Sequence, residues 1–164
     1  MNKLPFKKFP TITNNRIILR EITPEDLKDI IKISFYNAIQ AKTTEDAAIM
    51  QAKIDQDYSD GNSIHWGIED LETNQIVGTC GYYRGFEKES GELGCVLLSQ
   101  FQGKGYMTSA MQLAIDFGIE KLKLKKIWSA TSKDNLAAIK LLERLNFSKT
   151  ADLEDDEIEF IYNH

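Results

Sequence analysis

The stretch Leu97-Leu98-Ser99-Gln100-Phe101-Gln102-Gly103-Lys104-Gly105-Tyr106-Met107-Thr108 joins a short apolar run to a long helical pattern. Before it, residues 92–98 read Glu-Leu-Gly-Cys-Val-Leu-Leu, which is typical of a buried strand. After it, apolar residues recur at helical spacing over 107–122, so we predict a helix that is buried on most sides. The first N–H groups of a helix lack intrahelical partners and point the same way. The stretch therefore predicts a turn that binds a phosphate or pyrophosphate.

A plain tight turn is the alternative, because glycine tolerates positive φ and close backbone approach. Two other phosphate motifs are excluded. A dinucleotide fingerprint needs a third glycine where Thr108 stands and an acidic residue near Lys125. A Walker-type loop needs Gly-Lys-Ser/Thr after four intervening residues, a spacing that this chain lacks.

The wider pattern resembles the GNAT family of N-acetyltransferases. Residues 100–105 match its Gln/Arg-x-x-Gly-x-Gly/Ala signature, and Asn135 followed by a helical run to Phe147 is similar to its second cofactor segment. Residues 16–27 resemble the opening of the branch that acetylates the N-termini of ribosomal proteins. The resemblance covers nearly the whole chain and implies an acyltransferase that uses acetyl-CoA.

The resemblance also implies which residues bind acetyl-CoA. Backbone N–H groups of residues 102–108 would hold the pyrophosphate, and residues 97 and 98 would bond the pantetheine arm like an extra strand. Asn135 would touch the pantetheine, although an asparagine there also suits a helix cap. The implied cofactor-binding residues are Val96, Leu97, Leu98, Gln102, Gly103, Lys104, Gly105, Tyr106, Met107, Thr108 and Asn135.

Glu92 is the candidate general base, because the family often places a carboxylate at the start of this strand. A surface acid at a strand end is the alternative. Leu142 stands where some members carry a tyrosine proposed as the general acid, so thiolate protonation has no assigned group. The missing tyrosine is also the one sequence feature that favours a non-catalytic acyl-CoA-binding or regulatory domain.

Phe35, Tyr36 and Tyr82 are the candidate residues for binding the acceptor amine, with packing in the core as the alternative. Residues 152–159 hold six acidic side chains, which suggests a cationic acceptor such as a polyamine or a peptide N-terminus, although a plain solvated loop is the favoured alternative. The amine would attack the thioester directly. Cys80 and Cys95 fit a reduced core, and the two histidines predict no metal site.

Composition predicts one soluble domain over residues 1–164. The chain is 42% hydrophobic and 27% charged, with a net charge of −5 that disfavours nucleic-acid partners. No apolar run is long enough to cross a membrane, and the start lacks the core of a signal peptide, so we expect a cytoplasmic protein. The sequence leaves a monomer and a homodimer open.

The element pattern predicts an α+β fold with a mixed, mostly antiparallel sheet of about seven strands flanked by four helices. Residues 1–15 are expected to form a loosely packed tail. The expected helices cover 23–38, 44–58, 107–122 and 135–145. The expected strands cover 16–22, 64–69, 76–84, 91–98, 126–131, 147–152 and 158–162.

Overall fold

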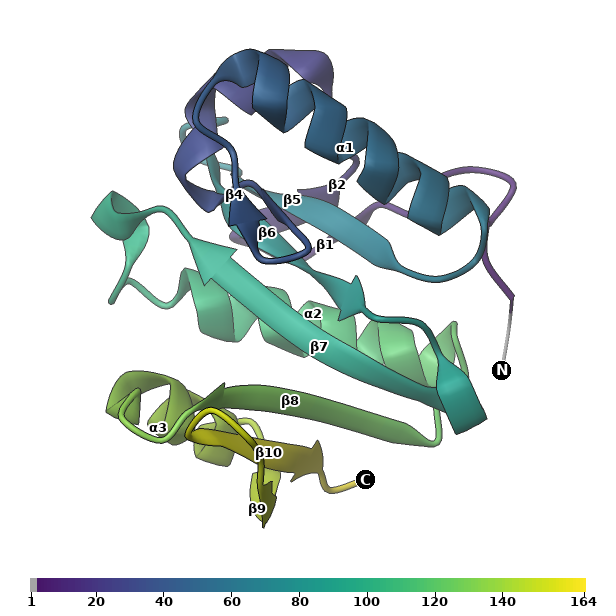
Figure 1. The fold of residues 1–164 in the computed structure, drawn as a ribbon, viewed down its shortest axis with the longest axis vertical. Coiled ribbons are helices and arrows are strands. Elements are labelled where there is room, and N and C mark those ends of the chain that lie inside the picture. Colours follow the sequence, from purple (N-terminus) through teal and green to yellow (C-terminus); the bar gives the residue numbers. More distant parts are fainter. Residues whose placement is uncertain (1–2) are drawn as a thin grey trace.

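The computed structural model describes residues 3–164, which form one mixed sheet with helices on both faces (Figure 1). The strand order is β1-β2-β5-β6-β7-β8-β10-β9, and every neighbouring pair is antiparallel except β7 and β8. This confirms the predicted α+β class. The strands are β1 (Ile12–Thr13), β2 (Ile17–Arg20), β5 (Ile64–Asp70), β6 (Ile76–Tyr83), β7 (Ser90–Leu97), β8 (Lys126–Ser132), β9 (Phe147–Asp152) and β10 (Glu157–Tyr162).

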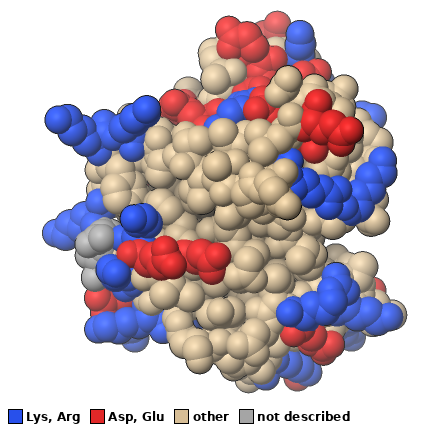
Figure 2. Space-filling model, turned by 180° about the vertical axis from the view of Figure 1, so that it is seen from behind, with Lys and Arg blue, Asp and Glu red and all other residues tan. Residues whose placement is uncertain are grey.

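The long helix α2 (Tyr106–Glu120) covers one face of the sheet and forms the main core with it. Strand alternation places Ile64, Trp66 and Ile68 on this face, where all three are fully buried. The Tyr82 hydroxyl crosses the interface and donates to the Ala114 carbonyl at 2.7 Å. Figure 2 shows this side of the molecule, where uncharged side chains cover most of the centre and charged ones gather nearer the edges.

Helix α1 (Thr44–Ser59) covers the opposite face, as Figure 1 shows. Its start is the one that the sequence predicts, because the Thr43 hydroxyl accepts a hydrogen bond from the Asp46 N–H at 3.1 Å. The third helix, α3 (Leu136–Arg144), lies between β8 and β9 in the chain and packs against β9. These three helices confirm the last three of the four predicted ones.

The helix predicted over 23–38 is wrong. The chain forms two short 3-10 segments, η1 (Pro24–Asp29) and η2 (Ile31–Ile33), and then a hairpin of β3 (Phe35–Tyr36) and β4 (Ile39–Gln40). Three β-branched residues crowd residues 30–33 and weaken an α-helix there. Asn37 and Ala38 then adopt φ of 49° and 63°, the left-handed conformation of a tight hairpin turn.

The prediction that residues 1–15 form a loosely packed tail is also wrong for residues 3–15, which the structure describes. Leu4 is 8% exposed, and the Phe6 and Phe9 rings pack against the core. The Trp66 indole donates to the Pro10 carbonyl at 2.9 Å, and β1 pairs with β2 to give an eighth strand. Two more 3-10 segments, η3 (Glu87–Glu89) and η4 (Ser99–Phe101), complete the elements. The predicted tail therefore belongs to the core of the domain.

Candidate active site

Strands β7 and β8 pair over only three positions and then part. The parallel register joins residues 90–92 to 126–128, and the Ser129 hydroxyl donates to the Leu93 carbonyl at 2.7 Å just beyond it. Figure 1 shows the two strands diverging from there toward the end of the sheet where α2 begins. The rest of β7 is therefore paired on one side only.

Strand alternation shows which backbone groups of β7 are unpaired. The Leu98 N–H donates to the Val77 carbonyl at 2.9 Å, so Val96, two residues earlier, also bonds toward β6. The N–H and C=O groups of Cys95 and Leu97 point the other way, toward the side of β7 from which β8 has diverged. We call this edge, residues 94–97, the open edge of β7. Of the three predicted residues 96–98, only Leu97 turns its backbone toward the open edge.

The predicted anion turn follows this edge directly. Gly103 and Gly105 adopt φ of +74° and +84°, and α2 starts at Tyr106 without a side-chain cap. Within residues 3–164, the N–H groups of residues 103–108 have no backbone partner, whereas the Gln102 N–H already donates to the Ser99 carbonyl at 3.3 Å. A Cβ on Gly103 would meet nothing within 4 Å, so the space beside this glycine is open. These groups fit the phosphates of a nucleotide such as CoA.

Arg16 supports the turn from the protein side, a contact that the sequence analysis missed. Its guanidinium stacks 4.2 Å from the centre of the Tyr106 ring, and its Nη1 lies 2.8 Å from the place where a Cβ on Gly105 would sit. The contact joins the residue before β2 to the start of α2 across ninety residues of sequence, so no local pattern signals it. Only glycine fits at position 105 without moving the arginine.

Asn135 lies at the start of α3, where its Oδ1 accepts a hydrogen bond from the Ala138 N–H at 3.1 Å. The structure thus shows the cap, and contact with a cofactor remains a proposal. Leu142, at the position of the family's tyrosine, is 3% exposed and belongs to the core. It supplies no proton to a leaving thiolate.

Glu92 is the last β7 residue paired with β8, so it lies where the two strands part. It is 8% exposed, and the register places it beside Tyr83 and Trp128 on the face that α1 covers. Arg84 Nε lies 3.1 Å from its Oε2, but no hydrogen bond to that oxygen forms within the described residues. Burial, and to a lesser degree Glu157, raises the pKa of Glu92 while Arg84 opposes the rise. A carboxylate with a raised pKa is better suited to accept a proton near neutral pH.

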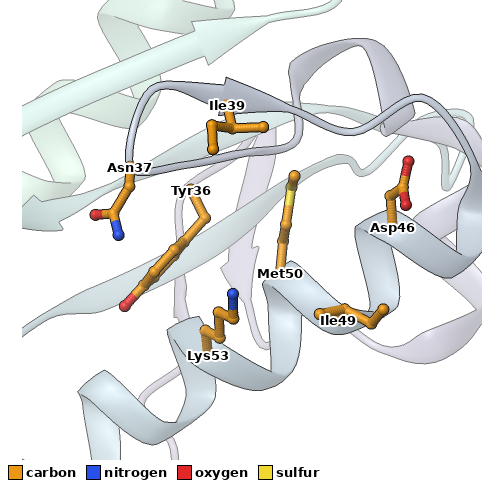
Figure 3. Close-up of a pocket in the computed structure, with 7 residues that line it drawn as sticks. All are labelled: Tyr36, Asn37, Ile39, Asp46, Ile49, Met50 and Lys53. Atoms are coloured by element: carbon orange, nitrogen blue, oxygen red, sulfur yellow. The ribbon is translucent and has the colours of Figure 1, made fainter.

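A pocket of about 470 Å³ lies on the same face, between the central strands, α1 and the β3–β4 hairpin. Phe35 and Tyr36 line it, and the Tyr36 hydroxyl donates to Asp57 Oδ2 at 2.9 Å. The Val96 side chain also faces this pocket. Figure 3 shows a smaller hollow of about 190 Å³ next to it, where Tyr36, Asn37 and Ile39 of the hairpin face Met50 and Lys53 of α1.

Tyr82, the third predicted acceptor residue, is fully buried on the α2 face and does not line the pocket. Its neighbour Tyr83 does, together with His65, a histidine to which the sequence analysis assigned no role in the site. Because adjacent strand residues face opposite sides of the sheet, the sequence alone indicates that one of the two tyrosines faces the core and the other the pocket. Only the position of α2 shows which is which.

The acidic run does not lie at either pocket. Residues 152–159 span the turn between β9 and β10, and none of them lines either pocket. In this turn Asp156 pairs with Lys133 at 3.0 Å, and both side chains are largely exposed. The placement favours the solvated loop over a role in holding the acceptor.

Comparison with known proteins decides the family. The model of the acetyltransferase (GNAT) domain matches residues 16–148. The chain belongs to the GNAT acetyltransferase family. It is 31% identical over 157 residues to an uncharacterised N-acetyltransferase, p20, of Bacillus licheniformis, covering 90% of this chain and 87% of that one. Its relatives are named N-acetyltransferases, so this GNAT protein is an acyltransferase.

Two solved GNAT structures show the same fold. A putative ribosomal-protein-serine acetyltransferase from Vibrio cholerae has a TM-score of 0.78 at 18% identity, over 94% of this chain and 97% of that one. A dodecameric spermidine N-acetyltransferase from the same organism has a TM-score of 0.76 at 19% identity, over 90% and 94%. Within residues 3–164, no helix has the length and apolar character to span a bilayer, and no group of metal-ligating side chains gathers.

Proposed function

We propose that this GNAT protein transfers the acetyl group of acetyl-CoA to a primary amine by direct attack on the thioester. One observation carries the proposal: the open edge of β7 leads straight into a turn whose N–H groups are unpaired. The unpaired N–H groups of residues 106–108 are those of any uncapped helix start, but residues 103–105 add three more beside an unpaired strand edge. The location of this activity is proposed to be the cytoplasm.

In this proposal the backbone holds the co-substrate. The N–H groups of residues 103–108 bind the pyrophosphate, helped by the dipole of α2. The N–H and C=O groups of Cys95 and Leu97 bond the amides of the pantetheine arm, as a neighbouring strand would. Bound acetyl-CoA supplies the acetyl group as an activated thioester. Arg16 keeps the turn in shape through its contacts with Gly105 and Tyr106.

Glu92 is proposed to accept the proton of the amine, directly or through one water. The amine nitrogen forms the new N–C bond, the C–S bond breaks, and the sulfur leaves as the CoA thiolate. The proton moves from nitrogen to the carboxylate and then to solvent or to the thiolate. A thiol with a pKa of about 8.5 leaves tolerably as an anion, so the reaction proceeds without a tyrosine at position 142.

The acceptor pocket opens on the Glu92 face of the sheet, and its walls combine apolar side chains with uncharged polar ones. Within the described lining, Asp57 is the carboxylate and Arg84 the cation. A primary amine with one positive charge and an uncharged body therefore fits best, and a protein N-terminus or a polyamine are the proposed classes. Spermidine and ribosomal proteins are named as the substrates of structural neighbours, which supports testing both.

A thiol-release assay tests the proposal. Purified protein with acetyl-CoA and a panel of primary amines should release CoA thiol in an amine-dependent manner. A non-catalytic acyl-CoA-binding domain, which the buried Leu142 favours, predicts CoA binding without release. A site for another phosphate ligand predicts that ATP or NAD stabilises the protein as strongly as CoA.

A further inference from the structure

The inner wall of the acceptor pocket carries three polar side chains next to one another. Register and alternation place Ser63 opposite Tyr83, with His65 two residues further along the same face. The rings of His65 and Tyr83 stack with centres 4.5 Å apart. All three line the pocket on β5 and β6, away from α2. We call them the distal cluster.

The Ser63 hydroxyl has no hydrogen-bond partner of its own. It is buried, with the residue 5% exposed, and makes no hydrogen bond within residues 3–164. An unpaired buried hydroxyl costs about 1–3 kcal/mol, so a ligand group that pairs it gains affinity.

The distal cluster is uncharged at neutral pH. Burial lowers the pKa of His65 to about 4, so its ring presents one N–H donor and one nitrogen acceptor. Burial likewise raises the pKa of Tyr83 well above its usual value, which keeps its hydroxyl protonated. The three side chains therefore offer no negative charge of their own to a second ammonium group.

We propose that Ser63, His65 and Tyr83 form a subsite for an uncharged hydrogen-bonding group of the acceptor, an amide or a hydroxyl. This inference rests on the proposed function. Ser63 and His65 lie at β5, two strands away from β7, and two strand spacings are about 10 Å, whereas Tyr83 on β6 lies opposite Glu92. A group bound by Ser63 and His65 therefore lies about 10 Å from the reacting nitrogen, which equals the reach of roughly three extended residues of a peptide.

Three linear primary amines of equal length test the subsite. Their far ends carry a carboxamide, an ammonium or a methyl group. We expect the highest kcat/KM for the carboxamide. Ser63→Ala and His65→Phe should each lower its kcat/KM by roughly threefold to tenfold, the effect of one hydrogen bond, and change the methyl amine by less than about twofold.

Ser34→Ala is the matched control. Ser34 lines the same pocket, but its hydroxyl already donates to the Ile30 carbonyl at 2.7 Å. It should leave the ranking of the three amines unchanged. Calorimetric binding of each amine, measured without acetyl-CoA, gives a readout that does not depend on turnover.

The outcomes separate the subsite from the proposed function. If no amine is acetylated, the proposed function fails, and the subsite stands only if the carboxamide still binds more tightly than the methyl amine and Ser63→Ala removes the difference. If amines are acetylated but the ammonium compound is preferred, or the variants reduce all three alike, the subsite is refuted while the proposed function stands.

Discussion

The prediction with the clearest structural basis concerns Gly103. Its φ is +74°, an added Cβ would meet open space, and the anion is proposed to bind at this turn. Gly103→Val therefore blocks the ligand without a clash inside the protein. The left-handed backbone costs a side-chain-bearing residue about 1–2 kcal/mol. A domain with the usual 5–15 kcal/mol of stability tolerates that loss and stays folded.

The expected loss of binding is measurable by thermal unfolding. A ligand at 100 times its dissociation constant adds about 2.7 kcal/mol to the native state, which is roughly 5–11 °C in Tm for a domain of this size. If the valine weakens CoA binding a hundredfold, the same CoA concentration adds only about 0.4 kcal/mol, or roughly 1 °C.

Gly85→Val is the matched control for this experiment. Gly85 has a φ of +78° and equally open space around its Cβ direction, but it lies in the loop between β6 and η3 rather than in the anion turn. It should lose stability like Gly103→Val yet keep the full CoA shift. Lys104→Ala should also keep most of it. A full CoA shift in Gly103→Val, or an equal loss in Gly85→Val, would refute the assignment of the turn.

The remaining predictions concern the base, the buried histidine and the acidic loop. Glu92→Gln should lower kcat on the order of 10²-fold and leave the KM for acetyl-CoA unchanged. The loss of kcat should shrink as the pH rises, because free amine then becomes plentiful. A kcat equal to that of the wild type at all pH values would exclude Glu92 as the base. The pKa of His65 falls from 6.5 to about 4 on folding, so the unfolded state takes up a proton on this histidine first as the pH drops. The free energy of unfolding should therefore fall by up to about 3 kcal/mol between pH 6.5 and 4. His65→Gln should remove that part of the dependence of the unfolding free energy on pH. A slope equal to that of the wild type in His65→Gln would contradict the burial of a neutral ring. Because the loop lies outside both pockets, replacing Asp155 and Asp156 by Asn should leave the KM for a cationic amine within about twofold, and a clear rise in KM would restore the loop as an acceptor-binding element.

The sequence predicted the turn between β7 and α2 well because its signals are local. A short apolar run ends shortly before a pair of glycines, and apolar residues at helical spacing follow. These neighbouring residues suffice to predict a strand, a turn and a helix in that order. The same locality explains α1, whose N-cap Thr43 and first-turn acids lie within four residues of one another. Elements defined by short-range patterns could therefore be predicted.

Features set by long-range packing could not be predicted. Residues 35–40, which include the end of the helix expected over 23–38, form a hairpin instead, and this hairpin packs against α1. The expected tail packs against the core beneath α2, and the Trp66 indole bonds to it. Likewise, Tyr82 and Tyr83 are equivalent in the sequence, and only the position of α2 places the first in the core and the second in the pocket. The contact between Arg16 and Tyr106 depends on the whole fold, and the residues next to Arg16 in the sequence do not indicate it.

Transfer of an isotopically labelled acetyl group tests the central claim most directly. The protein is incubated with labelled acetyl-CoA and a primary amine, and mass spectrometry follows both the amine and the intact chain. Direct attack predicts that the label appears as an amide on the amine and never on the protein, with one CoA thiol released for each amide. Label on the chain, for instance on Cys95 beside the open edge, or no labelled amide with any amine, would contradict the account.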